Sequence, residues 1–257
     1  MHRRFMLALV AVVLTASVFV STAAANHSWG GYHWARTSNP FTVKLGNNLT
    51  GSWTSILNTS SSDWSQSTVL DTVVVAGQSA QRRCKPTSGQ DEICNNTYGN
   101  NGWLGVATIW LASGTKHITQ GTVKVNDTYF NTATYNSTAW RNVVMCQEVG
   151  HTFGLDHQDE NFSNTNLGTC MDYTNDPSTN QHPNKHDYDQ LLTIYSHLDS
   201  TTTVGAVASR SEAQSENAAP IAVERSDRIS DSTVVETFAD GSRRVTHITW
   251  AIPGTFG

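Results

Sequence analysis

The apolar positions along the chain predict strands and helices up to about residue 199. Strands are expected where apolar residues alternate or β-branched residues cluster, and helices where apolar residues recur every three to four positions. The expected strands are 41–45, 68–76, 102–111 and 117–126. The expected helices are about 50–65, 136–154 and 184–199. Residues 26–199 are therefore expected to form one domain that contains both strands and helices.

The pattern changes beyond residue 199. Residues 200–220 are rich in Ser, Thr, Ala and Glu and contain no aromatic residue, which is typical of a linker or disordered segment. Residues 221–257 regain apolar alternation, and Asp240–Gly241 predicts the turn of a β-hairpin. Two strands alone are only marginally stable in water, so this tail is expected to pack on something or to remain mobile.

The first 25 residues predict a secretory signal peptide. Arginines near the start precede sixteen mostly apolar residues, and small residues up to Ala25 form a cleavage pattern. A membrane anchor is the alternative, but the apolar run is shorter than the ~20 residues that a spanning helix needs. We therefore expect a secreted, extracellular protein that has no membrane contact after cleavage.

Charge and composition narrow the class of partner. Removing residues 1–25 takes away Arg3 and Arg4 and no acidic residue, which changes the formal net charge from −5 to −7. No basic cluster remains to bind a phosphate backbone, which argues against nucleic acid as a partner.

Eight tryptophans and ample apolar content are enough for one sizeable core. A monomer is expected.

All four cysteines lie beyond the expected signal peptide. An even number of cysteines in an oxidising compartment indicates two disulfides. The sequence allows three pairings of the four residues. Cys84 and Cys94 are favoured as one pair because their bond would close a short polar loop.

The stretch CQEVGHTFGLDHQDE has the spacing of a metal site. Gln147 and His151 lie four apart on an expected helix and project from the same face. Glu148 lies beside them, where it can face a metal-bound water. Gly154 tolerates the left-handed conformation of a sharp bend, which can return His157 to the same point. Three neutral donors and a water would form an open four-coordinate zinc site.

This stretch resembles the metzincin signature H-E-x-x-H-x-x-G-x-x-H, with Gln147 in place of the first histidine. Downstream, GTCMDY is similar to the metzincin Met-turn, and Met171 takes the place of the methionine beneath the metal. Tyr173 matches the tyrosine that astacin-like and serralysin-like members place near the zinc. The resemblance covers about residues 34–198.

The resemblance implies the architecture of a matrixin-, astacin- or serralysin-like catalytic domain. Its fold class is α+β. It has a twisted, mostly parallel sheet with an antiparallel edge strand, an active-site helix, the Met-turn and a C-terminal helix. The resemblance also implies the second disulfide, since Cys146 immediately precedes Gln147 and Cys170 immediately precedes Met171. A Cys146–Cys170 bond would pin the Met-turn to the active-site helix.

The implied activity is that of a zinc-dependent endopeptidase acting on an extended polypeptide. Zinc would polarise the scissile carbonyl, Glu148 would act as general base, and Tyr173 would hydrogen-bond the developing oxyanion. The strand 117–126 is expected to be the edge with which the substrate pairs. Because a glutamine oxygen is a weaker donor than imidazole, reduced zinc affinity is expected. The alternative is a non-catalytic metal-binding or protein-binding domain, which only Gln147 favours.

Other residues carry weaker expectations. A Glu-x-x-His pair alone usually marks a solvated helix face, and the additional matches at 157, 171 and 173 argue against that interpretation here. Acidic residues after such a site are typically solvated or calcium-associated, so a structural Ca²⁺ is a further expectation at Asp156, Asp159 and Glu160. Three histidines lack ligand spacing and are expected at the surface or in a substrate cleft: His117, His182 and His186.

Overall fold

A computed structural model describes residues 26–206 and 222–252, and the expected signal peptide lies outside the described residues. One sheet has the strand order β3-β2-β4-β6-β5-β9-β8-β7, with β1 also paired to β6. The strands are β1 His33–Trp34, β2 Phe41–Asn48, β3 Leu70–Ala76, β4 Asp91–Asn96, β5 Trp103–Leu111, β6 His117–Asn126, β7 Val223–Arg228, β8 Thr233–Phe238 and β9 Arg243–Trp250.

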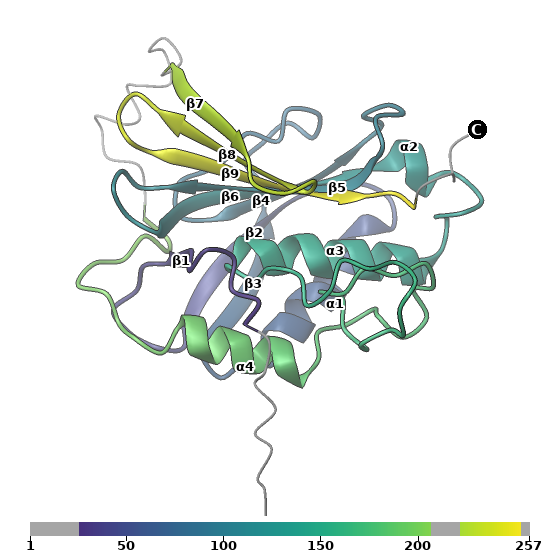
Figure 1. The fold of residues 1–257 in the computed structure, drawn as a ribbon, viewed down its shortest axis with the longest axis horizontal. Helices are drawn as coiled ribbons and strands as arrows, with labels where there is room; N and C mark the ends of the chain where they lie inside the picture. Colours follow the sequence, from purple (N-terminus) through teal and green to yellow (C-terminus); the bar gives the residue numbers. More distant parts are fainter. Residues whose placement is uncertain (1–25, 207–221, 253–257) are drawn as a thin grey trace, which may run out of the picture.

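The helices are α1 Trp53–Trp64, α2 Asp127–Phe130, α3 Thr138–Thr152 and α4 Lys185–Ile194. In Figure 1 the sheet lies above α3 and α1, and α4 lies farther from it on the same side. Helix α3 packs on β5 and β6, while α1 packs on β3 and on α3. The core between these layers buries Trp34, Trp64 and Phe153 completely. Within residues 26–206 and 222–252, no helix has both the length and the apolarity needed to cross a bilayer.

The mixed sheet agrees with the expected α+β class. Strands β3, β2, β4 and β6 run parallel to one another, and β5 runs antiparallel to β6. Two details of the prediction are wrong. The segment 117–126 is β6, which lies between β4 and β5 and is not an edge. The antiparallel strand β5 is not an edge either, because β9 pairs with its other side.

The loop expected around the first disulfide contains β4, which the sequence analysis missed. Strand β4 begins with Asp91 and Glu92, two carboxylic acids that are rare inside a sheet, yet both are fully buried. Glu92 accepts hydrogen bonds from side chains that surround it, among them Asn48 at 2.6 Å and Gln90 at 2.7 Å. These partners stabilise a strand whose polar sequence resembles a loop.

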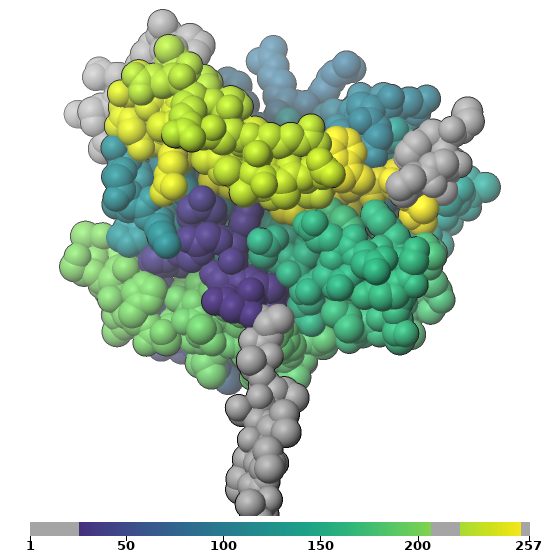
Figure 2. Space-filling view, in the orientation of Figure 1, coloured from purple at the N-terminus to yellow at the C-terminus, as the bar shows by residue number. Residues whose placement is uncertain are grey.

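The C-terminal strands extend the main sheet. β8 and β9 form the hairpin expected at Asp240–Gly241, and β7 adds a third strand. Figure 2 shows β7–β9 (yellow and yellow-green) lying over the N-terminal residues drawn in purple. Part of the expected linker is also ordered: the Thr203 backbone N–H donates to the Ala35 carbonyl at 2.9 Å. Residues 207–220 of that linker lie outside the described residues.

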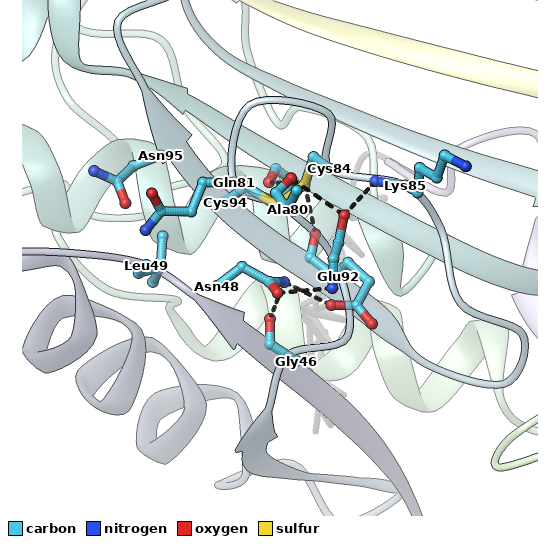
Figure 3. Close-up of a disulfide and its surroundings, with 12 residues drawn as sticks. Gly46, Asn48, Leu49, Ala80, Gln81, Cys84, Lys85, Glu92, Cys94 and Asn95 are labelled. Atoms are coloured by element: carbon cyan, nitrogen blue, oxygen red, sulfur yellow. Dashed lines mark hydrogen bonds between the residues drawn. A yellow bond between two sulfur atoms is a disulfide. The ribbon is translucent and has the colours of Figure 1, made fainter.

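Both disulfide predictions are confirmed. Cys84 pairs with Cys94, and Cys146 pairs with Cys170, each with a Cα–Cα distance of 5.9 Å. Figure 3 shows the Cys84–Cys94 bond beside β4, close to the Asn48 and Glu92 side chains. The Cys146–Cys170 bond joins α3 to the turn that contains Met171, as the resemblance implied.

Candidate metal centre

Helix α3 places His151 in the interior, and side-chain hydrogen bonds stabilise both ends of this helix. The Ser137 hydroxyl accepts a hydrogen bond from the Trp140 backbone N–H and caps the first turn. At the other end, the Trp34 indole donates to the Thr152 carbonyl at 3.0 Å and the Tyr195 hydroxyl donates to the Phe153 carbonyl at 2.9 Å. These side chains satisfy carbonyls that a helix end leaves unpaired.

Gly154 turns the chain so that His157 returns to His151. Its φ is +90°, and an added Cβ would lie 2.0 Å from the Tyr32 carbonyl oxygen, so both conformation and space require glycine here. The Nε2 atoms of His151 and His157 then lie 3.2 Å apart. The expected bend is therefore present, and it brings two of the predicted ligands together.

The other ring nitrogens of these two histidines have partners. His151 Nδ1 is 2.8 Å from the Leu155 carbonyl oxygen, and His157 Nδ1 is 3.1 Å from a Glu160 carboxylate oxygen. A carbonyl only accepts, so Nδ1 of His151 carries the proton and Nε2 keeps its lone pair. Metal-binding histidines typically show this arrangement, with the outer nitrogen donating to an oxygen. Burial holds the pKa of His151 well below its usual value, which favours the neutral ring.

A third histidine, which the sequence analysis missed, comes from β9. His247 is fully buried, and its ring stacks on His151 with centroids 4.0 Å apart and meets the His157 ring edge-on at 4.4 Å. One ring nitrogen from each of the three residues lies within 4.8 Å of the others. We call His151, His157 and His247 the central histidine cluster.

The central histidine cluster fits a transition metal. Neither ring nitrogen of His247 has a hydrogen-bond partner among the described residues, although both are buried. An unpartnered buried nitrogen is costly unless something else binds it. Burial, with the neighbouring His151 ring as a second cause, holds the pKa of His247 well below its usual value, so the ring is neutral. Three neutral imidazoles are the donor set of an open zinc site.

Gln147 is hydrogen-bonded at both ends of its side chain. Its amide nitrogen donates to the Cys170 carbonyl at 2.8 Å, and its amide oxygen accepts from the Thr249 hydroxyl at 2.6 Å. The side chain thus connects α3 with the Cys146–Cys170 turn and with β9. The amide oxygen is the only atom of Gln147 suited to bind zinc, and it faces Thr249.

Glu148 lies beneath β5, fully buried. An added Cβ on Gly105 would lie 2.3 Å from a Glu148 carboxylate oxygen, so this glycine leaves the space that the carboxyl group fills. Burial raises the pKa of Glu148 to about 8, although the Thr249 hydroxyl and the Ala107 backbone oppose this shift weakly. Neither carboxylate oxygen makes a hydrogen bond of good geometry within the described chain. The carboxyl group therefore stays available for proton transfer.

Met171 lies against helix α3, and Tyr173 lies against His157. Gly150 packs against the Met171 thioether, since an added Cβ would lie 2.7 Å from Sδ. Met171 is thus buried against α3, next to His151. The Tyr173 ring is 4.3 Å from the His157 ring, and its hydroxyl is 3.0 Å from the Ser232 hydroxyl oxygen. Burial raises the pKa of Tyr173, so its hydroxyl keeps its proton.

Strand β9 pairs with the side of β5 that would otherwise be open to an extended peptide substrate. In the antiparallel register Ala107 pairs with His247, and Gly105 pairs with Thr249. The prediction that a substrate pairs with 117–126 is wrong, because β4 and β5 occupy both sides of that strand. A cleft of about 470 Å³ reaches the cluster beside His157, between the N-terminal loop and β8–β9.

The remaining predicted residues lie in different places. Asp156, Asp159 and Glu160 line the cleft. His182 is exposed and lies 2.7 Å from an Asp63 carboxylate oxygen, as expected for a surface histidine. The His186 ring stacks on the His27 ring at 4.8 Å. The structural calcium stays a prediction.

Comparisons with known proteins were made at the level of sequence and of structure. No family model matches the chain, and no curated protein matches it. Among solved structures, myroilysin is similar at 12% identity, with a TM-score of 0.38, over 66% of this chain and 98% of that chain. High choriolytic enzyme 1, a hatching enzyme zinc-protease from the medaka fish Oryzias latipes, is similar at 10% identity, with a TM-score of 0.35, over 64% and 94%. These values are too low for any residue role to be transferred to this chain.

Proposed function

We propose that this protein is a secreted zinc endopeptidase whose zinc ligands are His151, His157 and His247. The convergence of three buried histidine rings carries the proposal. A zinc ion bound there would act as a Lewis acid on a peptide carbonyl and lower the pKa of a bound water toward ~7. Because all three donors are neutral, they leave the full charge of the dication in place.

Glu148 would take the proton from the attacking water and pass it to the leaving amine. Its raised pKa suits both roles, since a group with a pKa of about 8 exchanges its proton readily near neutral pH. Tyr173 lies against His157 with its proton retained, so its hydroxyl is suited to donate to a developing oxyanion.

Gln147 has a supporting role in this proposal. The sequence analysis predicts it as a zinc ligand in place of the first histidine of the signature, and we propose that His247 supplies that ligand instead. The Gln147 amide holds Thr249, two residues along β9 from His247, and thereby fixes the strand that supplies the histidine. Alternate residues of a strand share a face, so Val245, His247 and Thr249 all point into the protein.

The cleft beside His157 is the proposed route for a polypeptide substrate. Three of the residues that line it are acidic, and none is Lys or Arg. A peptide that carries a basic side chain would therefore be favoured there. This route does not use β5, because β9 already pairs with the side of β5 that β6 leaves open.

A non-catalytic metal-binding domain is the second candidate. Two observations favour it: Glu148 is fully buried, and the Ser232 hydroxyl contacts the Tyr173 hydroxyl. In that case the cluster would bind zinc without turnover. The two candidates differ in a single outcome, which is chelator-sensitive cleavage of a peptide by the zinc-loaded protein.

The experiment combines zinc analysis by mass spectrometry with a fluorogenic peptide-cleavage assay. We expect His247→Ala to hold one zinc fewer than the wild-type protein and to lose cleavage, with an unchanged circular dichroism spectrum. Gln147→Ala should keep the wild-type zinc content, and His182→Ala serves as the matched surface control. Full zinc content in His247→Ala together with zinc loss in Gln147→Ala would overturn the ligand assignment. Zinc binding without cleavage would leave the second candidate.

A further inference from the structure

A second group of histidines lies where three distant segments meet. His33 comes from β1, His117 begins β6, and His197 and Asp199 follow α4. Strands β1 and β6 pair in parallel with His33 opposite His117. The Asp199 backbone N–H donates to the Arg36 carbonyl at 2.9 Å and brings the third segment to the same place. We call these four residues the Asp199 cluster.

The side chains of the Asp199 cluster converge on one carboxylate oxygen. Asp199 Oδ1 lies 3.2 Å from His117 Nε2, 3.6 Å from His33 Nε2 and 3.7 Å from His197 Nε2. The Nε2 atoms of His33 and His197 lie 3.2 Å apart. A tetrahedral ion with bonds of about 2.0–2.1 Å holds its ligand atoms roughly 3.3 Å from one another. The spacing among His33, His197 and Asp199 is therefore close to that of a tetrahedral metal site.

The outer contacts orient these groups toward a common centre. His33 Nδ1 lies 2.9 Å from the Gly31 carbonyl oxygen, which can only accept, so Nδ1 carries the proton and Nε2 faces the cluster. Arg36 binds the other oxygen of Asp199 at 2.8 Å and fixes the carboxylate plane. Oδ1 is left to the histidines. Such outer partners are typical of metal ligands.

We propose that His33, His197 and Asp199 bind a second transition-metal ion, and that Zn²⁺ is the ion that fits. Two imidazoles and one carboxylate offer three ligand atoms within 4.8 Å of one another, and a water would complete a four-coordinate shell. The site lies apart from the central histidine cluster and does not depend on the proposed peptidase activity. His197 is half exposed, so a metal ion can enter from solvent.

The proposed ion would connect segments that are far apart in the chain. His33 and His197 are separated by 164 positions. A metal bridge that closes so long a loop stabilises the folded state, because the unfolded chain cannot hold the ligands together. The ordinary alternative is a network in which protonated histidines pair with Asp199, without any metal.

Zinc stoichiometry separates these two possibilities. The probe is Zn²⁺ itself, added in excess to the full chain. Dialysis then removes the free and weakly bound zinc, and mass spectrometry measures the zinc that stays bound. We expect two equivalents in the wild-type protein, one in His197→Ala and one in His247→Ala. The double variant should hold none. His182→Ala is the matched control, since His182 also pairs with an aspartate at the surface, and it should keep two.

Thermal unfolding gives a second readout that does not involve activity. Zinc should raise the melting temperature of His247→Ala, in which only the Asp199 cluster is complete, and should not raise that of the double variant. Equal zinc content in wild type and His197→Ala would overturn this proposal while leaving the central site untouched. Equal content in wild type and His247→Ala, with a loss in His197→Ala, would instead overturn the proposed catalytic site alone.

Discussion

The two histidine clusters differ in the place of their carboxylate. The central histidine cluster consists of three imidazoles, and Glu148 does not belong to the donor set. In the Asp199 cluster the carboxylate is itself the point on which the rings converge. A carboxylate ligand offsets part of a metal's charge, whereas neutral donors leave the charge to act on a substrate. The first arrangement suits catalysis and the second suits a structural bridge.

The clusters also differ in how they meet solvent. The three central rings are buried, and the cleft reaches them beside His157. The Asp199 cluster lies at the surface, with the His197 side chain 49% exposed. Electrostatic interactions are stronger where water is excluded. A metal charge at the central histidine cluster would therefore act more strongly on a substrate than one at the Asp199 cluster, because of burial as well as the donor set.

The largest expected effect comes from replacing Glu148, the carboxylic acid that is not among the proposed zinc ligands. Glu148→Gln keeps the shape of the side chain and removes its ability to accept a proton. General acid–base catalysis contributes roughly 10²–10⁴-fold, so the kcat of peptide cleavage should fall by about that factor while zinc content is unchanged. Glu224→Gln, an exposed change on β7, is the control. Unchanged cleavage in Glu148→Gln would contradict the role of this residue.

The second effect, on stability and zinc affinity, concerns the Cys146–Cys170 disulfide, which lies near the central histidine cluster only. Removing Cys146–Cys170, whose cysteines are 24 positions apart, should lower the free energy of unfolding by about 3 kcal/mol. Because this bond holds the turn bonded to Gln147, zinc at the central cluster should bind more weakly. Replacing Cys84–Cys94 by alanines should lower stability without weakening that zinc, because the residues labelled around it in Figure 3 belong to neither cluster. Titration of both double variants with zinc checks the difference.

A smaller effect on pH dependence comes from Asp91, a buried acid outside both clusters. Burial raises its pKa from 3.8 to about 8, despite a hydrogen bond from the Thr152 hydroxyl. The folded state therefore keeps a proton that the unfolded chain loses, and stability falls as the pH rises through this window. With zinc removed by a chelator, Asp91→Asn should lose less stability than the wild-type protein between pH 5 and pH 8. Asp231→Asn, which is exposed, should follow the wild type; identical slopes for all three would refute the shift.

The smallest expected effect is on substrate preference at the cleft. Asp159 lines the cleft and is not among the proposed ligands. Partly exposed charge pairs are worth roughly 0.2–1 kcal/mol, so Asp159→Asn should reduce the preference for a lysine-containing peptide over its neutral analogue by a few-fold. The ratio of the two kcat/KM values measures this. Asp176→Asn, outside the cleft, should leave the ratio unchanged, and an equal change in both variants would argue for another route.

The local half of the central site was predictable because its parts are close in sequence. Helical spacing placed Glu148 and His151, and the glycine turn returned His157 within six residues. The Cys84–Cys94 bond was predicted from its short loop, whereas the Cys146–Cys170 bond was implied by the resemblance to the Met-turn. The broad α+β class was likewise predictable from alternating strand and helix patterns.

The other half depends on a contact that spans most of the chain. Thr249 lies 102 positions from Gln147, and no local pattern specifies that β9 pairs with β5. The sequence therefore predicts a hairpin in the tail without naming the strand on which it packs, and it predicts an edge at 117–126. One signal was present: in the alternation of β9, His247 falls on the buried face together with Val245. A histidine on a buried strand face, with no acidic residue beside it, needs a partner from elsewhere.

The most direct test of the central claim is a crystal structure of the zinc-loaded protein with anomalous scattering measured at the zinc edge. We expect an anomalous peak about 2.0–2.1 Å from one ring nitrogen each of His151, His157 and His247, with Gln147 still bonded to Thr249. A peak bound by the Gln147 amide oxygen, with His247 turned away, would contradict the account.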